Sequence, residues 1–104
     1  MRASTREYIK KISKLEFPEE VKSVILFGSE VYGTPNMRSD IDLAIVLYTL
    51  PTIKLKCDVE EFLEIIQCPY ILQLTFVTDI YEPMNFDVRE DIFKRGVVIY
   101  ERKV

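Results

Sequence analysis

The sequence predicts a single domain of the α/β or α+β sandwich class, with a four-stranded sheet covered by helices. Four short runs rich in β-forming residues alternate with segments of helical periodicity. The chain has 104 residues, the length of one domain, and its 48% content of apolar residues is enough for a core. Residues 1–104 are therefore expected to form one domain.

The elements follow from local patterns. The expected strands are 23–27, 40–48, 70–78 and 97–102; the expected helices are one before Pro18, a turn over 29–33, and the segments 51–67 and 85–96. Ser4 or Thr5 and Asn85 are candidate N-caps, and Gly96 is the stop signal of the last helix. Thr52 or Pro51 is the expected start of the helix in 51–67. About a dozen residues join the first two strands, so their pairing could be parallel or antiparallel.

Composition excludes several classes of function. The net charge is −3 and the basic residues are scattered, which argues against general nucleic-acid or membrane binding through a basic face. Histidine is absent, so acid–base or metal chemistry must use other side chains. The N-terminal segment lacks the long apolar run of a signal peptide or membrane span, and a cytoplasmic location is expected.

Two carboxylates begin the strand 40–48. Side chains alternate between the faces of a strand, so Asp40 and Asp42 share one face, while the other face is continuously apolar. Their spacing along the strand is about 6–7 Å, and the two charges repel each other unless a cation lies between them. Mg²⁺ suits such oxygen ligands and fills its remaining positions with water and substrate phosphates.

A Gly-Ser pair directly follows the strand 23–27. Gly28 lets the backbone approach an anion closely, and N–H groups of a helical turn that opens at Ser29 would favour a phosphate. Gly28 and Ser29, together with Asp40 and Asp42, thus predict a site for a nucleoside triphosphate and a metal ion.

The stretch "GSEVYGTPNMRSDIDLAIV" resembles the signature of the polymerase-β-type nucleotidyltransferase superfamily, and the ending "RGVVIYER" resembles its minimal members, which are often paired with a HEPN-domain protein in toxin–antitoxin modules. The resemblance implies a mixed four-stranded sheet with helices packed mainly on one face. It also implies that Gly28 and Ser29 hold the triphosphate of ATP and that Asp40 and Asp42 bind Mg²⁺. A nucleotidyl group would then pass to an acceptor such as a tyrosine of the partner.

The sequence departs from the family pattern at two places. Active members carry a third carboxylate on a neighbouring strand, and the matching residue here is Gln73, whose amide could ligate a metal but cannot serve as a base. Asp79 is a weaker substitute. Minimal members often have basic residues after Gly-Ser, whereas this chain has Glu30 and Tyr32, and less positive charge predicts weaker triphosphate binding. Tyr32 could stack on a nucleotide base, but packing against a helix is the favoured expectation.

These features leave alternatives open. The chain could be a Mg²⁺-dependent nucleotidyltransferase, with Asp40 and Asp42 as catalytic residues, that acts as the antitoxin of a HEPN pair. It could instead be a catalytically weakened partner-binding module, or a nucleotide-sensing subunit of the same fold. The intact Gly-Ser and Asp-x-Asp motifs favour the enzyme, whereas Gln73 and Glu30 favour the other two hypotheses.

Overall fold

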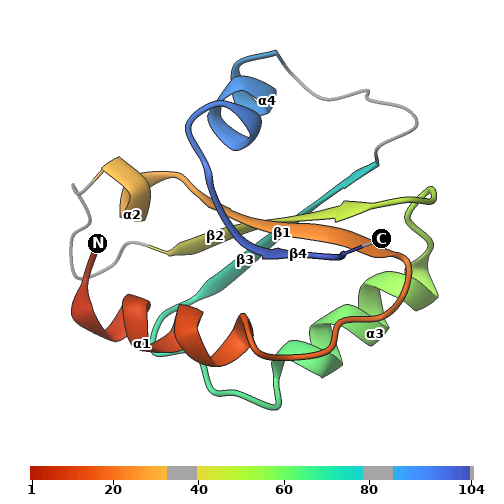
Figure 1. Cartoon of the computed structure of the whole chain (residues 1–104), viewed down its shortest axis with the longest axis horizontal. Helices are drawn as coiled ribbons and strands as arrows, with labels where there is room; N and C mark the ends of the chain where they lie inside the picture. The colour runs from red at the N-terminus through yellow and green to blue at the C-terminus, as the bar shows by residue number, and fades with distance from the viewer. Residues whose placement is uncertain (33–39, 79–85, 104) are drawn as a thin grey trace.

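The computed structural model describes residues 1–32, 40–78 and 86–103, where four strands alternate with four helices (Figure 1). The order along the chain is α1 (Ala3–Ile12), β1 (Val21–Phe27), α2 (Ser29–Tyr32), β2 (Ile41–Leu47), α3 (Ile53–Leu63), β3 (Leu72–Thr78), α4 (Phe86–Phe93) and β4 (Val97–Glu101). This is the predicted order, with boundaries shifted by a few residues. Every helix in these segments is too short or too polar to cross a membrane.

The sheet is mixed, with the strand order β3-β2-β1-β4. β1 runs antiparallel to both β2 and β4, which settles the pairing that the sequence left open. β2 and β3 are parallel, and α3 forms the crossover connection that parallel neighbours need. The expectation of a mixed four-stranded sheet is therefore confirmed.

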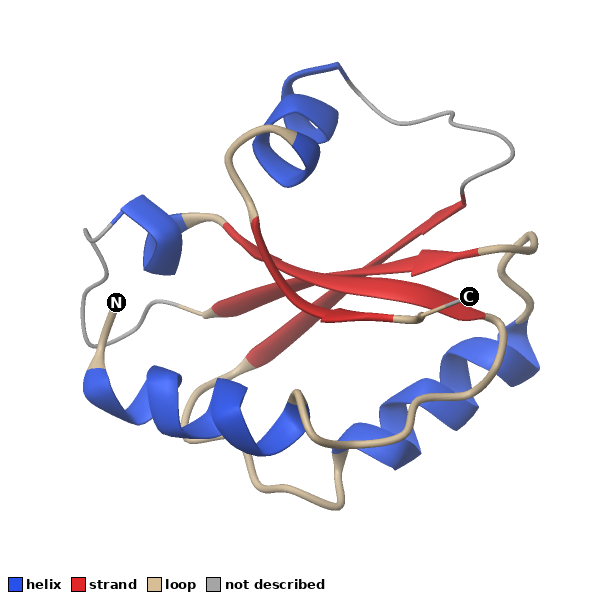
Figure 2. Ribbon diagram, in the orientation of Figure 1, coloured by secondary structure: helices blue, strands red, loops and turns tan. Residues whose placement is uncertain are grey.

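The two faces of the sheet are covered differently (Figure 2). The two longer helices, α1 and α3, pack on one face, whereas the short α2 and α4 lie toward the other. The predicted alternation of β2 is confirmed: the larger core, shared with α1 and α3, contains its residues Ile41, Leu43, Ile45 and Leu47. Ala44 and Val46 belong to a second cluster with Ile92 of α4. Asp42 has the same parity as Ala44, so it lies on the α4 side.

The predicted helix caps had mixed outcomes. Of the two expected starts of α3, Thr52 is the N-cap, since the Leu55 N–H donates to its hydroxyl at 3.1 Å. The predicted cap of α1 was wrong, because the helix begins at Ala3 and both Ser4 and Thr5 lie inside it. Their hydroxyls are used instead in contacts with Tyr70 and Glu30, which are distant in the sequence. The predicted cap Asn85 and the substitute acid Asp79 lie outside the described residues.

Candidate functional site

Asp42 lies directly against Gly28. The last residue of β1, Phe27, pairs with Asp42, and Gly28 then turns with a φ of +83°, a conformation that favours glycine. A Cβ added to Gly28 would lie only 2.5 Å from Oδ2 of Asp42. The backbone turn and the carboxylate can therefore occupy this space together only because residue 28 has no side chain.

The single turn of α2 continues from this glycine. The N–H of Val31 donates to the Gly28 carbonyl at 3.0 Å, and that of Tyr32 reaches the same oxygen at 3.4 Å. The helical turn predicted after Gly-Ser is thus present, and it starts beside the Asp42 carboxylate. Of the predicted site residues, Gly28, Ser29 and Asp42 are brought together here.

Gln73 stands beside both predicted metal ligands. In the parallel ladder Gln73 pairs with Asp42, and its amide Nε2 donates to Oδ2 of Asp40 at 2.5 Å. The amide supplies a hydrogen bond to Asp40, but it has no proton-accepting carboxylate to offer. Within the described ranges, no three Asp, Glu, Cys or His side chains converge in a metal-binding arrangement.

The electrostatics of the site fit a cation between the two aspartates. Burial raises the pKa of Asp42, and the negative charges of Asp40 and Asp91 raise it further. Ionised Asp42 is therefore disfavoured in the protein alone. A divalent ion held by Asp40 and Asp42 would relieve this repulsion, so the residues present fit Mg²⁺, with the Gln73 amide as the neighbouring polar group.

The influence of Asp91 was missed at the sequence level. Asp91 lies in α4, which the sequence predicted as a helix without assigning it any part in the site. Its neighbour Ile92 belongs to one hydrophobic cluster with Ala44, which is two residues beyond Asp42 on the same face. The only local signal was the four-residue spacing of Asp91 and Arg95, which suits a pair on one helix face but does not indicate what that face covers.

Tyr32 joins α2 to α4. Tyr32 contacts the helix α4 through its hydroxyl, which donates a hydrogen bond to Oδ1 of Asp91, while half of the residue stays exposed (50%). Nη1 of Arg95 approaches the same oxygen at 3.5 Å. Stacking of Tyr32 on a nucleotide base stays a prediction. The hydrogen bond to Asp91 is the main cause that raises the pKa of Tyr32. A phenol, a carboxylate and a guanidinium therefore meet on the side of the sheet that carries Asp42.

Glu30, in the turn that follows Gly28, is buried and paired instead of carrying a free charge. It is 1% exposed, and its carboxylate pairs with the Arg2 guanidinium while accepting from the Thr5 hydroxyl at 2.9 Å and the Arg2 backbone N–H at 3.2 Å. Burial opposes its ionisation, but these hydrogen bonds and the Arg2 charge outweigh burial and lower the pKa of Glu30. Arg2 therefore compensates the negative charge of Glu30, so Glu30 opposes a bound phosphate less than its sequence position suggests.

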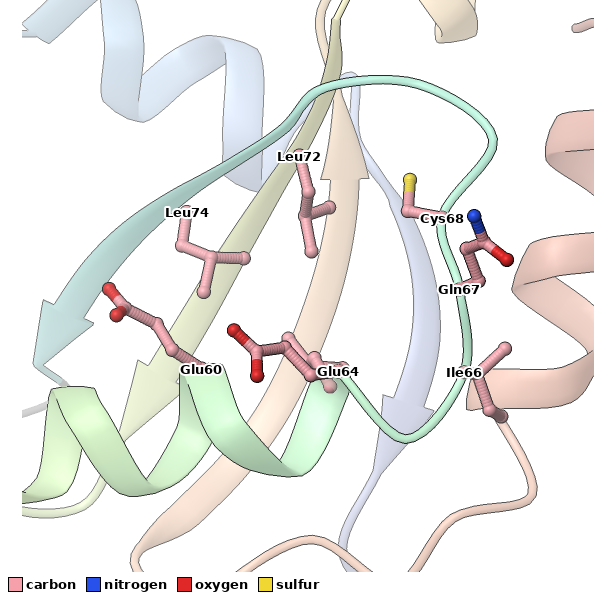
Figure 3. Close-up of a pocket in the computed structure, with 8 residues that line it drawn as sticks. Glu60, Glu64, Ile66, Gln67, Cys68, Leu72 and Leu74 are labelled. Atoms are coloured by element: carbon pink, nitrogen blue, oxygen red, sulfur yellow. The ribbon is translucent and has the colours of Figure 1, made fainter.

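A cavity of about 650 Å³ lies elsewhere, between α3, β3 and the loop that joins them (Figure 3). Leu72 and Leu74 line it, and they belong to the side of the sheet that packs on α3, away from Asp42. Glu60 and Glu64 stand at this cavity, whose lining among the described residues includes no lysine or arginine. It is therefore poorly suited to a triphosphate.

Comparison with protein families decides the assignment. Residues 7–104 match the family model described as polymerase beta, nucleotidyltransferase. The chain belongs to this nucleotidyltransferase family. Comparison with curated protein sequences finds no match.

Solved structures show the same nucleotidyltransferase fold. A chain of the tri-AMPylated HEPN toxin–MNT antitoxin complex of Shewanella oneidensis is 15% identical, with a TM-score of 0.59 over 93% of this chain and 72% of that one. A chain of a toxin–antitoxin complex with AMP-PNP is 14% identical, with a TM-score of 0.53 over 96% of this chain and 73% of that one. A Sulfolobus solfataricus protein, provisionally described as a nucleotidyltransferase, is 17% identical, with a TM-score of 0.54 over 95% of this chain and 78% of that one.

Because the pKa of Asp42 is raised, we expect Asp42 to affect the stability of the protein. A carboxyl whose pKa is raised by folding destabilises the protein once it is ionised, so Asp42→Asn should raise the melting temperature by a few degrees at pH 7 in EDTA. The gain should shrink as the pH falls and Asp42 itself becomes protonated. Added Mg²⁺ should stabilise the wild type and have less effect on Asp42→Asn. Thermal unfolding with and without MgCl₂ measures both effects.

Asp58→Asn is the matched control, because Asp58 is exposed on α3. Equal Mg²⁺ stabilisation of the wild type and Asp42→Asn would show that the cation does not bind at Asp42.

Proposed function

We propose that this chain is a Mg²⁺-dependent nucleotidyltransferase that transfers AMP from ATP to a hydroxyl of a protein partner, and that it acts as the antitoxin of a HEPN/MNT pair. Asp40 and Asp42 are the catalytic carboxylates that hold the metal ion. Gly28 and Ser29 hold the triphosphate.

One observation carries the proposal: the Asp42 carboxylate touches Gly28, where the helical turn of Ser29 begins. A phosphate bound at this turn would lie beside the metal ligands, as nucleotidyl transfer requires. Bound Mg²⁺ would neutralise the charge that develops on the phosphates. Family membership and the nucleotide-containing complexes of the same fold support this assignment.

Each residue of the candidate site has a separate role in the proposed transfer. In this proposal Gly28 permits close approach of the backbone to the triphosphate, and the Ser29 hydroxyl would donate to a phosphate oxygen. Asp40 and Asp42 would hold the metal ion, and the Gln73 amide orients Asp40 through its hydrogen bond. The acceptor hydroxyl would approach from the α4 side of the sheet, where Asp42 lies.

A second candidate is a partner-binding module of the same fold with little or no catalysis. Gln73 favours it, because the amide beside Asp42 cannot deprotonate an acceptor hydroxyl. In this case nucleotide binding and complex formation would survive, but turnover would not.

The experiment is transfer of label. The protein is incubated with α-phosphate-labelled ATP, Mg²⁺ and a HEPN-domain protein as the candidate partner, and label on that partner is measured. We expect Asp42→Ala to lower the rate on the order of 10³-fold, since metal stabilisation of the transition state supplies several kcal/mol. Asp58→Ala, on the exposed side of α3, is the control and should keep the rate.

The outcome separates the two candidates. Absence of label with every nucleoside triphosphate, together with a complex that Asp42→Ala leaves equally tight, would exclude the enzyme and favour the binding module.

A further inference from the structure

We propose that Tyr32 is an acceptor in cis: the domain transfers AMP from ATP to the Tyr32 hydroxyl of its own chain, and Asp91 takes the proton. This inference rests on the proposed nucleotidyltransferase activity and adds a modification site to it.

Tyr32 lies in α2, close to the residues that are proposed to bind the nucleotide. Ser29 and Tyr32 are three residues apart, so they lie on the same side of this helical turn. Both follow Gly28, against which the Asp42 carboxylate rests. The side chain of Tyr32 is half exposed, so an incoming phosphate can reach its hydroxyl.

Asp91 is hydrogen-bonded to the Tyr32 hydroxyl and can take its proton. The Tyr32 hydroxyl donates to Oδ1 of Asp91, which is the geometry of an acceptor hydroxyl bound to its general base. Asp91 is held over the site because Ile92 packs in one cluster with Ala44, which is on the same face as Asp42. Asp91 also lies near enough to Asp42 for its charge to influence that carboxyl. It therefore supplies the proton acceptor that Gln73 cannot.

The chemical step balances with ATP as the donor. Oη of Tyr32 attacks the α-phosphorus, an Oη–P bond forms, and the bond from the α-phosphorus to the oxygen bridging to the β-phosphate breaks. Pyrophosphate leaves with that oxygen, and the phenolic proton passes to Oδ1 of Asp91. The product is AMP esterified to Tyr32. Its remaining phosphate charge would lie near Arg95, whose guanidinium already approaches Asp91.

The test uses the whole chain without a partner. The protein is incubated with Mg²⁺ and ATP labelled on either the α- or the γ-phosphate, followed by intact-mass measurement and peptide mapping. We expect label from the α-phosphate alone, a mass gain of one AMP unit, and the modification on Tyr32. The labelled fraction at a given time should not depend on protein concentration, because the transfer is within one chain.

Three variants locate the reaction. Tyr32→Phe should lose the label from that peptide, and Asp91→Asn should slow labelling about 100-fold or more. Tyr48→Phe should leave labelling unchanged, because Tyr48 follows the opposite end of β2 from Asp42. Thermal unfolding of each variant confirms that it is folded.

Label on another residue, or an unmodified Tyr32, would overturn the inference. If the partner protein is labelled while Tyr32 is not, the proposed function stands and only the self-modification fails. If neither is labelled, both fail.

Discussion

Replacing Arg2 by alanine should lower the free energy of unfolding by about 3–5 kcal/mol, because it leaves the Glu30 carboxylate buried without its cation. For a domain of this size the melting temperature should fall by roughly 10 °C or more. Arg2 also lies over the Tyr70 ring, with its guanidinium carbon 3.5 Å from the centroid, so packing is lost as well. Thermal or urea unfolding at pH 7 measures the change.

The pH dependence gives a second readout of the same pair. The pKa of Glu30 is lowered by folding, so its stabilisation is present above the ordinary glutamate pKa and is lost as the pH falls through the lowered value. The difference between the wild type and Arg2→Ala should therefore narrow in acid. Adding Glu30→Gln to Arg2→Ala should recover part of the loss, because the buried charge is removed.

Arg6→Ala is the matched control, since Arg6 is exposed on α1, the helix that Arg2 precedes. Equal stability of Arg2→Ala and Arg6→Ala would refute the role of Arg2 as the partner of the buried carboxylate.

Replacing Gln73 by glutamate should accelerate transfer to a partner hydroxyl by about 10²–10⁴-fold, the usual contribution of a positioned general base. The structure places the new carboxylate beside Asp42 and Asp40. In EDTA the variant should be less stable than the wild type, because three like charges then meet on one face. Mg²⁺ should restore the stability. Labelling rates and thermal unfolding measure the two effects.

Gln67→Glu is the control for the change of charge, because Gln67 is exposed and lines the cavity on the α3 side. A Gln73→Glu variant with unchanged Mg²⁺ binding and unchanged transfer would show that Gln73 does not occupy the position of the third carboxylate.

Local sequence patterns were sufficient for much of the fold. The two-residue period of β2 assigned Ile41 and Leu43 to the larger core and placed Asp42 on the opposite face, because the geometry of a strand requires that alternation. The order of the elements and the Thr52 cap were also predictable, since both depend on residues close together in the chain. Gln73 was matched to the family's third carboxylate by resemblance and by the alternation of its own strand, and the parallel ladder pairs Gln73 with Asp42.

The surroundings of the site depended on longer-range packing. Local patterns could not pair Glu30 with Arg2, 28 residues away, because that contact forms only once α1 packs on the sheet. Nor could they place Asp91 against Tyr32, because α4 reaches the face of the sheet that carries Asp42 only through its packing on β1 and β2.

The sequence by itself determined the carboxylates, the glycine turn and the face that carries them, because backbone periodicity sets these features within a few residues. Only the tertiary structure decided the charges around them: Arg2 cancels Glu30, and Asp91 faces Tyr32. Electrostatic interactions depend on distance in space, and the packing of helices on a sheet brings together charges that are far apart along the chain.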